Sequence, residues 1–155
     1  MPLDAIGMMV QLFSTCRLDY CNSLFHGISD GLMTQLQSAQ NAAARLVSGA
    51  RRYHHIPPVL HQFHWLPVRK HVDFKISTLV YRLLSGTVPS YLATDCQLVC
   101  DEGRRRLHST NSRTCVIRWT YSQFGDRCFA AEGPKLWSSI LVQLRQADLS
   151  YKQFK

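Results

Sequence analysis

Apolar residues recur every three to four positions through the first third of the chain, a spacing that places them on one face of an α-helix. A first helix is predicted from about residue 4 to 25, ended by Gly27. A second is predicted from Ser29 or Asp30, which both suit a helix N-cap, to Gly49. The expected buried faces are Ile6, Met9, Val10, Phe13, Tyr20 and Leu24 in the first helix, and Leu32, Leu36, Ala39, Ala43 and Leu46 in the second.

The same period continues further along the chain. A third helix is predicted from Pro67, a residue preorganised for a first turn, to Gly86. A short helical turn is expected around PSYLA (89–93), and a fourth helix after EGP (132–134) that runs on through SSILVQL (138–144). The expected buried faces are Val68, Val72, Ile76, Leu79, Val80 and Leu83 in the third helix, and Leu136, Trp137, Ile140, Leu141 and Leu144 in the fourth.

Between residues 94 and 128 the helical pattern fails. DEGRRRLHSTNSRT (101–114) has the composition of an exposed basic loop, and CVIRWTY (115–121) is rich enough in β-branched and aromatic residues for one short strand or hairpin. The fold class that follows is mainly α, a small bundle of about four to six helices with an irregular basic loop region. We expect two parts, a helical domain at 1–93 and a basic loop plus truncated helical region at 94–155.

Composition favours a folded chain without a membrane anchor. Hydrophobic residues make up 46% of the 155 residues, enough for a buried core. No run reaches the roughly 18 apolar residues of a membrane-spanning helix. The start, MPLDAIGMMVQLF, lacks the basic segment and cleavage site of a secretory signal. We therefore expect an intracellular protein, of the nucleus or the cytoplasm, that does not contact a membrane.

Charge is distributed unevenly along the chain. The formal net charge is +8, but residues 1–50 carry two basic and three acidic side chains, whereas residues 51–155 carry sixteen basic and seven acidic ones. A positive field confined to two thirds of a chain favours a polyanionic partner, of which nucleic acid is the commonest. The alternative is a basic surface that only keeps the protein in solution.

Six cysteines are present, but their spacing does not match a structural zinc site. The spacings are Cys16-x4-Cys21, Cys96-x3-Cys100 and Cys115-x12-Cys128, none of which is a C-x2-C pair. In a reducing compartment we expect free thiols, with Cys21 and Cys128 in or near the core. A metal site or disulfides are the weaker alternatives.

The segment HQFHWLPVRKHVDFK (61–75) combines histidines with a tryptophan and a proline. His61 and His64 would suit zinc, but no carboxylate or cysteine stands at ligand spacing in the segment, so we expect no metal there. The favoured interpretation is a structural elbow in which Phe63 and Trp65 bury their rings and Pro67 turns the chain into the third helix. Val59, Leu60 and Leu66 are expected to belong to the same apolar patch.

Three blocks of the sequence, taken in order, resemble one family. They are RLDYCNSLFHGIS with LQSAQNAAARLVSGARR, then HHIPPVLHQFHWLPVRKHVDFKISTLVYRLLSGTVPSYL, then FGDRCFAAEGPKLW with a closing FK. Together they resemble the region after the palm domain in reverse transcriptases of LINE-type, non-LTR (jockey-like) retrotransposons, over about residues 9 to 155. Two positions depart from the family pattern. Cys16 replaces a serine, and SSILVQL replaces an Asn-Ser-Leu-Pro stop.

The resemblance implies a thumb-like domain at 1–93 and the start of a C-terminal region at 94–155, with the catalytic palm missing. Reverse transcription needs two metal ions held by palm carboxylates, including an adjacent Asp-Asp pair, and the sequence has no such pair. We therefore expect no catalytic residue, no metal, no cofactor and no independent enzymatic activity. LSYKQFK (149–155) has the pattern of a further helix that the chain end interrupts.

A thumb grips the template–primer duplex through its sugar–phosphate backbone, so the resemblance implies a binding surface for RNA or an RNA–DNA hybrid. The candidate binding residues are Arg45, Arg51, Arg52, Arg69 and Lys70 on one edge, and Arg104, Arg105 and Arg106 with Arg113 and Arg118 in the basic loop. Gln37, Gln40 and Asn41 are expected to add neutral hydrogen bonds. Tyr53 and Trp119 are candidates for stacking on bases, but core packing is the favoured expectation for both.

A second interpretation gives the chain no role in nucleic-acid binding. In it, the chain is a helical protein-interaction module, either without function or adopted by its host. Its exposed apolar faces would then mark the missing palm and drive self-association. Binding to a nucleic acid with a steep salt dependence would distinguish the first interpretation from the second.

Overall fold

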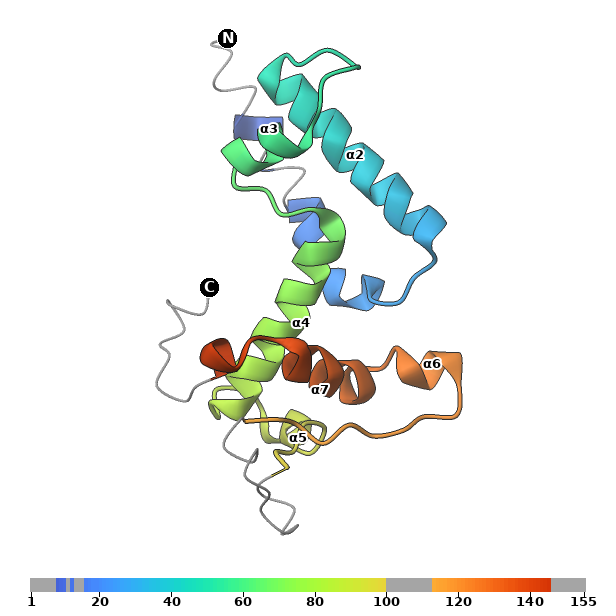
Figure 1. The fold of residues 1–155 in the computed structure, drawn as a ribbon, viewed down its shortest axis with the longest axis vertical. Helices are drawn as coiled ribbons and strands as arrows, with labels where there is room; N and C mark the ends of the chain where they lie inside the picture. The colour runs from blue at the N-terminus through green and yellow to red at the C-terminus, as the bar shows by residue number, and fades with distance from the viewer. Residues whose placement is uncertain (1–7, 11, 13–15, 100–112, 146–155) are drawn as a thin grey trace. The chain divides into compact units, whose positions relative to one another are not determined.

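Helices account for nearly all of the regular structure in the computed structural model, which describes residues 8–10, 12, 16–99 and 113–145 (Figure 1). The fold is mainly α, in the class of a small helical bundle, as the sequence predicts. The named elements are η1 (Asn22–Phe25), α2 (Asp30–Ser48), α3 (Pro57–Gln62), α4 (Val68–Leu84), α5 (Ser90–Ala93), α6 (Gln123–Asp126), α7 (Phe129–Ser139) and η3 (Val142–Arg145).

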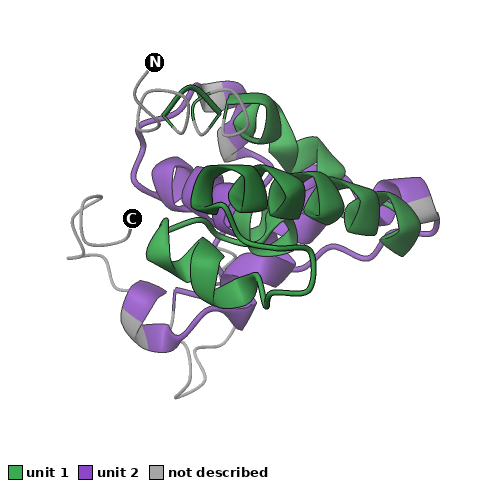
Figure 2. Ribbon diagram, turned by 90° about the horizontal axis from the view of Figure 1, so that it is seen from above, with its two compact units in different colours: residues 1–73 green, residues 74–155 purple. Residues whose placement is uncertain are grey.

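The chain divides into two compact units, Met1–Asp73 and Phe74–Lys155, coloured green and purple in Figure 2. We call them unit 1 and unit 2. The boundary falls inside α4, so this helix contributes its first turns to unit 1 and the rest to unit 2. The domain division expected from the sequence, after residue 93, stays a prediction.

The first predicted helix is interrupted before its expected end. Residues 8–10, 12 and 16–19 are helical, but Cys21 adopts a left-handed backbone conformation (φ 51°), and the 3-10 turn η1 follows it. A residue in the left-handed conformation cannot continue a right-handed helix. The apolar residues before and after Cys21 therefore do not form the single continuous face that their spacing predicts. The predicted burial is wrong for Met9, Tyr20 and Leu24, which are all exposed.

The second helix has the predicted ends but a different buried face. Ser29 is the N-cap of α2, and Gly49, in the left-handed conformation (φ 66°), is its C-cap. Its buried residues are Met33, Gln40 and Ala44, whereas Leu32 and Leu46 of the predicted stripe are exposed. The error lies in treating glutamines as outward-facing, because Gln40 occupies the centre of the buried face.

Helix α3 lies in a segment for which the sequence pattern predicts no helix. Pro57 and Pro58 form its first turn, where a missing N–H costs no hydrogen bond. The end is a Schellman motif in which the N–H groups of His64 and Trp65 donate to the carbonyls of His61 (3.0 Å) and Leu60 (2.8 Å). His64 therefore adopts the left-handed conformation (φ 56°) that such a motif requires.

The elbow at the end of α3 packs against α2. Trp65 and Val59 lie against a buried cluster formed by Ala44, Ile56 and Leu60. The rings of Phe63 and Trp65 are 5.7 Å apart between centroids. Both rings are only half-buried, and Leu66, expected in the same patch, is exposed.

Helix α4 matches its predicted stripe closely. Val68, Val72, Ile76, Val80 and Leu83 are buried at helical spacing. Its end is a second Schellman motif, because the N–H groups of Gly86 and Thr87 donate to the carbonyls of Leu83 (3.0 Å) and Arg82 (3.1 Å). Glycine supplies the left-handed residue here (φ 69°) at no steric cost.

The core of unit 2 is built around Trp137 of α7. This side chain is completely buried, lies against Tyr81, and donates from Nε1 to the carbonyl of Arg113 over 2.7 Å. Gly133 allows α7 to pack closely against α4, because a Cβ at this position would lie only 3.1 Å from Cγ2 of the buried Val80. The absence of a side chain at Gly133 therefore favours the short distance between α4 and α7 within this unit.

Two predictions for unit 2 are wrong. The fourth helix does not begin after Pro134; it begins at Phe129, encloses the proline, and ends at Ser139. Ile140 is extended (ψ 150°), so SSILVQL breaks the helix, and a 3-10 turn (η3) follows instead. In the described residues of CVIRWTY there is no strand, only a single antiparallel bridge between Leu98 and Cys115.

The cysteines are also distributed differently from the expectation. Cys96 and Cys115 belong to the core of unit 2, whereas Cys21 and Cys128, expected near the core, are exposed. Both exposed cysteines are N-cap residues, of η1 and α7, and positions at helix ends lie at the surface. All four, with Cys16, are free thiols.

Candidate nucleic-acid interface

A groove of about 410 Å³ follows one face of α2 in unit 1. We call it the α2–α4 groove, because α2 supplies all of its lining residues except Arg69, which belongs to the first turn of α4. Six of the seven lining residues carry a hydroxyl, amide or guanidinium group. The lining residues are Met33, Thr34, Gln37, Ser38, Asn41, Arg45 and Arg69.

An amide network fixes α4 beside this face of α2. Gln37 accepts through Oε1 from the backbone N–H of Val68 (2.9 Å), and Gln40 donates from Nε2 to the carbonyl of Leu66 (2.9 Å). The Nε2 of Gln37 donates to Gln40 Oε1 (2.9 Å) and Asn41 Oδ1 (3.0 Å). The network satisfies a donor at the start of α4 that the helix itself leaves unpaired, and so it positions Arg69 at the groove.

Two arginines give the groove a positive charge. Arg45 is half-buried, and its Nε is buried without a hydrogen-bond partner in the described part of the chain. Asn41 adds the two N–H donors of its amide group. None of the described residues that line the groove is acidic. Guanidinium and amide donors without a competing carboxylate are the groups that bind phosphate oxygens.

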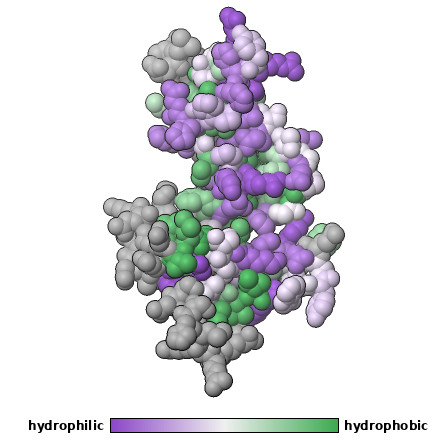
Figure 3. Space-filling model, viewed as in Figure 1, coloured by the Kyte–Doolittle hydropathy of each residue, from purple (hydrophilic) through white to green (hydrophobic). Residues whose placement is uncertain are grey.

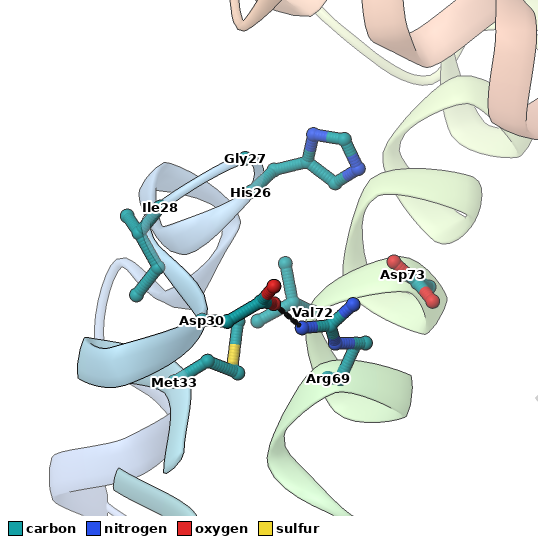
Figure 4. Close-up of a pocket in the computed structure, with 8 residues that line it drawn as sticks. All are labelled: His26, Gly27, Ile28, Asp30, Met33, Arg69, Val72 and Asp73. Carbon is teal, nitrogen blue, oxygen red and sulfur yellow. Dashed lines mark hydrogen bonds and ion pairs between the residues drawn. The ribbon is translucent and has the colours of Figure 1, made fainter. Parts of the chain in front are cut away.

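Arg69 is not fully free to bind an anion, because it forms an ion pair with Asp30 in the first turn of α2. Both side chains are well exposed to solvent, so the ion pair is weak. Figure 4 shows the two side chains extending toward each other from their helices. A polyanion that enters the groove therefore competes with the carboxylate of Asp30 for Arg69.

A smaller pocket of about 300 Å³ shares Met33 and Arg69 with the groove (Figure 4). Its charged residues are of both signs, since Asp30, Asp73 and Arg69 all line it and His26 contributes an imidazole. The remaining lining residues are Gly27, Ile28, Met33 and Val72. The carboxylates make this pocket a poor site for a phosphate.

The loop after α2 carries an exposed basic and aromatic surface. Its residues Arg51, Arg52, Tyr53, His54 and His55 are all exposed, and none is acidic. Arg51 donates to the hydroxyl of Tyr53 (3.1 Å), whose ring meets the ring of His54 edge to face at 4.9 Å. Tyr53 is 73% exposed, so the expected core packing is wrong and its ring is accessible for stacking.

The structure brings some of the predicted binding residues together and separates others. Arg45 and Arg69 line one groove, and Lys70 is exposed beside Arg69 on α4. Arg51 and Arg52 follow the end of α2, which spans roughly 28 Å from its start at Asp30. The predicted basic residues are therefore spread along the length of α2 and do not form a single cluster. Arg104, Arg105 and Arg106 lie outside the described residues.

Two of the three amide residues form hydrogen bonds within unit 1. Gln40 is buried and Gln37, which lines the groove, is half-buried, and both bond to the segment that begins α4, while their hydrogen bonds to a nucleic acid stay a prediction. Asn41 alone of the three combines a place in the groove with donors that the network does not use. On the face drawn in Figure 3, hydrophilic side chains cover most of the surface of unit 1.

The solvent exposure of one group of aromatic residues was not predicted from the sequence. Trp119 is 91% exposed, so core packing is wrong for it too, and Tyr121 and Phe124 beside it are also exposed. The sequence did contain a signal, because aromatic residues alternate with polar ones in RWTYSQF (118–124) without helical spacing. Exposed hydrophobic side chains also occur on the face of unit 2 drawn in Figure 3.

The described residues contain neither a metal-binding cluster nor a membrane-spanning helix. No three His, Cys, Asp or Glu side chains come together in a way that could hold a metal ion. No helix in the same part of the chain is both long enough and apolar enough to cross a membrane.

Comparison with known proteins identifies no relative. No family model, no curated protein and no solved structure matches the chain.

Proposed function

We propose that this chain binds a nucleic acid through its sugar–phosphate backbone, by the α2–α4 groove and the basic loop at 51–55. One observation carries the proposal: Arg45, Arg69 and Asn41 line the same groove, and none of its described lining residues is acidic. The ligand we infer is RNA or an RNA–DNA hybrid, held without reading its sequence.

The physical argument is electrostatic. A strand that enters the groove releases the counterions condensed on its phosphates, and each neutralised phosphate adds to the affinity at low salt. The net charge of +8 favours the approach of any polyanion, and the groove supplies the short-range donors that hold it. Backbone contacts of this kind fix the position of a strand and carry no base information.

The family resemblance of the sequence supports the choice of ligand. A thumb segment of a LINE-type reverse transcriptase would hold a template–primer duplex, and without the carboxylates of the palm it would bind without polymerising. We therefore propose a binding fragment, catalytically inactive alone, that acts inside the cell in the nucleus or the cytoplasm.

The test is the salt dependence of binding to an RNA–DNA hybrid. Arg45→Ala and Arg69→Ala are each expected to lower the slope of log K against log salt by about 1, and the double change Arg51→Ala with Arg52→Ala by about 2. Arg82→Ala is the matched control, because Arg82 is an exposed arginine outside the groove and the loop. An unchanged slope in all three groove and loop variants contradicts the proposal.

A second outcome would favour a protein-interaction module. If the chain binds no hybrid at low salt and sediments as an oligomer, its exposed apolar residues serve self-association instead. Sedimentation and hybrid binding measured on the same preparation distinguish these outcomes.

A further inference from the structure

Three exposed aromatic rings lie close together along one short segment of unit 2. Trp119 is 91% exposed, Phe124 is 84% exposed, and Tyr121 is fully exposed. Aromatic side chains of this size usually bury most of their surface, and their exposure costs hydrophobic free energy. Three exposed aromatic rings within six residues are typical of a surface that binds a ligand.

The turn that carries these rings is held by its own hydrogen bonds. Thr120 donates its hydroxyl to the carboxylate of Asp126, and Ser122 accepts from the N–H groups of Gly125 (3.0 Å, at Oγ) and Asp126 (3.0 Å, at the carbonyl). Glycine suits position 125, because a Cβ there would make a tight contact, 3.1 Å from Cβ of Thr120. The rings are therefore presented by a defined turn.

The start of the segment is also fixed. Cys115 is buried and bridges to Leu98, and the N–H of Val116 donates to the carbonyl of Gln97 over 2.8 Å. The aromatic turn thus emerges from the core of unit 2. A binding site preorganised in this way loses less entropy when a ligand binds than a flexible segment would.

Charge around the turn favours an anionic ligand. Arg118 is exposed next to Trp119 and donates from Nη2 to the carbonyl of Thr94 (3.4 Å), and Arg127 is exposed at the end of the segment. Arg113, at the start, is half-buried and donates to the carbonyl of Leu84. The one acidic residue between 113 and 127 is Asp126, whose carboxylate accepts from Thr120 and lies 4.0 Å from Nζ of Lys135. The carboxylate is thereby partly compensated, and the segment keeps a positive balance.

We infer that Trp119, Tyr121 and Phe124 form a platform on which unpaired bases of a single-stranded nucleic acid stack, with Arg118 beside its phosphates. Stacking needs a free base face, which a duplex does not offer, so the ligand is a single strand. The site is separate from the backbone grip proposed for unit 1, and the inference does not depend on that proposal.

Tryptophan fluorescence can follow this site directly. Trp137 is fully buried and Trp65 is half-buried, so the long-wavelength emission and the quenching by iodide report mainly Trp119. The probe is an oligothymidylate of about 12 nucleotides, compared with an abasic oligonucleotide of the same length, which has the same phosphates and no bases. We expect the oligothymidylate to quench the emission and the abasic strand to leave it unchanged.

Substitution then tests whether the ring itself binds. Trp119→Ala is expected to weaken oligothymidylate binding by about 5- to 100-fold and to leave abasic binding unchanged, whereas Trp119→Phe retains most of the affinity. Tyr91→Ala is the matched control, an exposed aromatic residue outside the segment. Gly125→Ala, which removes no ring but crowds Thr120, is expected to weaken binding as well, because it distorts the turn.

Two results would overturn the inference. One is equal binding of oligothymidylate and the abasic strand with no effect of Trp119→Ala. The other is self-association that Trp119→Ala abolishes, which would assign the rings to a second copy of the chain. Failure of the backbone grip in unit 1 would be recognised separately, from an unchanged salt slope in Arg45→Ala.

Discussion

Gln37 of α2 accepts a hydrogen bond from the backbone N–H of Val68, the first residue of α4, over 2.9 Å. The first N–H groups of a helix have no partner within the helix, so a side chain from a neighbouring element takes that role here. Gln40 adds a second link, to the carbonyl of Leu66. Two glutamines, one turn apart, therefore connect α2 to the start of α4 and place Arg69 at the groove.

This connection predicts a stability effect. Gln37→Ala is expected to lower the free energy of unfolding by about 1–3 kcal/mol, because the N–H of Val68 loses its acceptor while Val68 remains buried. Urea denaturation measures the change. Gln35→Ala is the matched control: Gln35 is exposed on the same helix, and its loss is expected to change stability by less than about 0.5 kcal/mol. Equal effects of the two substitutions would contradict the role of the amide network.

The same residues show where sequence reasoning reached its limit. The ends of α2 and α4 and the stripe of α4 follow from capping residues and apolar spacing, and the structure confirms them. The buried face of α2 does not follow from that spacing, because Gln40 bonds to Leu66, 26 positions away, and Gln37 bonds to Val68, 31 positions away. Only tertiary structure supplies partners at that separation, and a hydropathy pattern treats every glutamine as polar.

A different prediction concerns the end of α3. His64 occupies the left-handed position of a Schellman motif, where a side chain with a Cβ costs about 1 kcal/mol and glycine costs little. His64→Gly is expected to raise the free energy of unfolding by roughly 0.5 to 1 kcal/mol, seen as a higher melting temperature. His61→Gly, at a helical position in the same element, is expected to destabilise by a similar amount. A loss of stability in His64→Gly would contradict the backbone assignment.

The candidate site was predictable only in part. Charge and resemblance pointed to Arg45 and Arg69 as members of one edge, and both line the groove. That Arg69 would pair with Asp30, 39 positions earlier, depends on how α4 returns alongside α2 and cannot be derived from local pattern. For Tyr53 and Trp119, the general tendency of aromatic rings to be buried favoured the wrong alternative.

Thiol chemistry gives a third prediction. Burial raises the pKa of the Cys96 thiol from its ordinary 9.0 to about 12, and the neighbouring Cys115 adds to the rise. At pH 8 the folded chain is expected to react with iodoacetamide at the exposed Cys16, Cys21 and Cys128, and at Cys96 only after unfolding. Mass spectrometry of the alkylated peptides locates the label. Rapid labelling of Cys96 in the native chain would contradict its burial.

The same pKa has a consequence for stability. Because the folded pKa lies above that of the unfolded chain, the stability linked to the protonated thiol is fully present below about pH 9 and declines as the pH rises toward 12. Cys96→Ala is expected to flatten this decline between pH 9 and the highest pH at which the chain folds. Urea titrations at several pH values compare the slopes of the two proteins.

The ion pair between Asp30 and Arg69 gives the final prediction, which connects stability with binding. Both side chains are largely exposed, so Asp30→Asn is expected to cost less than about 1 kcal/mol of stability. The same change frees the guanidinium at the groove from a competing carboxylate, so hybrid affinity at low salt is expected to rise severalfold, while the salt slope stays the same because the number of phosphate contacts does not change. Asp95→Asn removes an equal charge outside the groove and separates this local effect from the change in net charge. Equal gains in the two variants would show that long-range charge alone acts on the ligand, whereas a larger gain in Asp30→Asn would show that this carboxylate competes with a phosphate for Arg69.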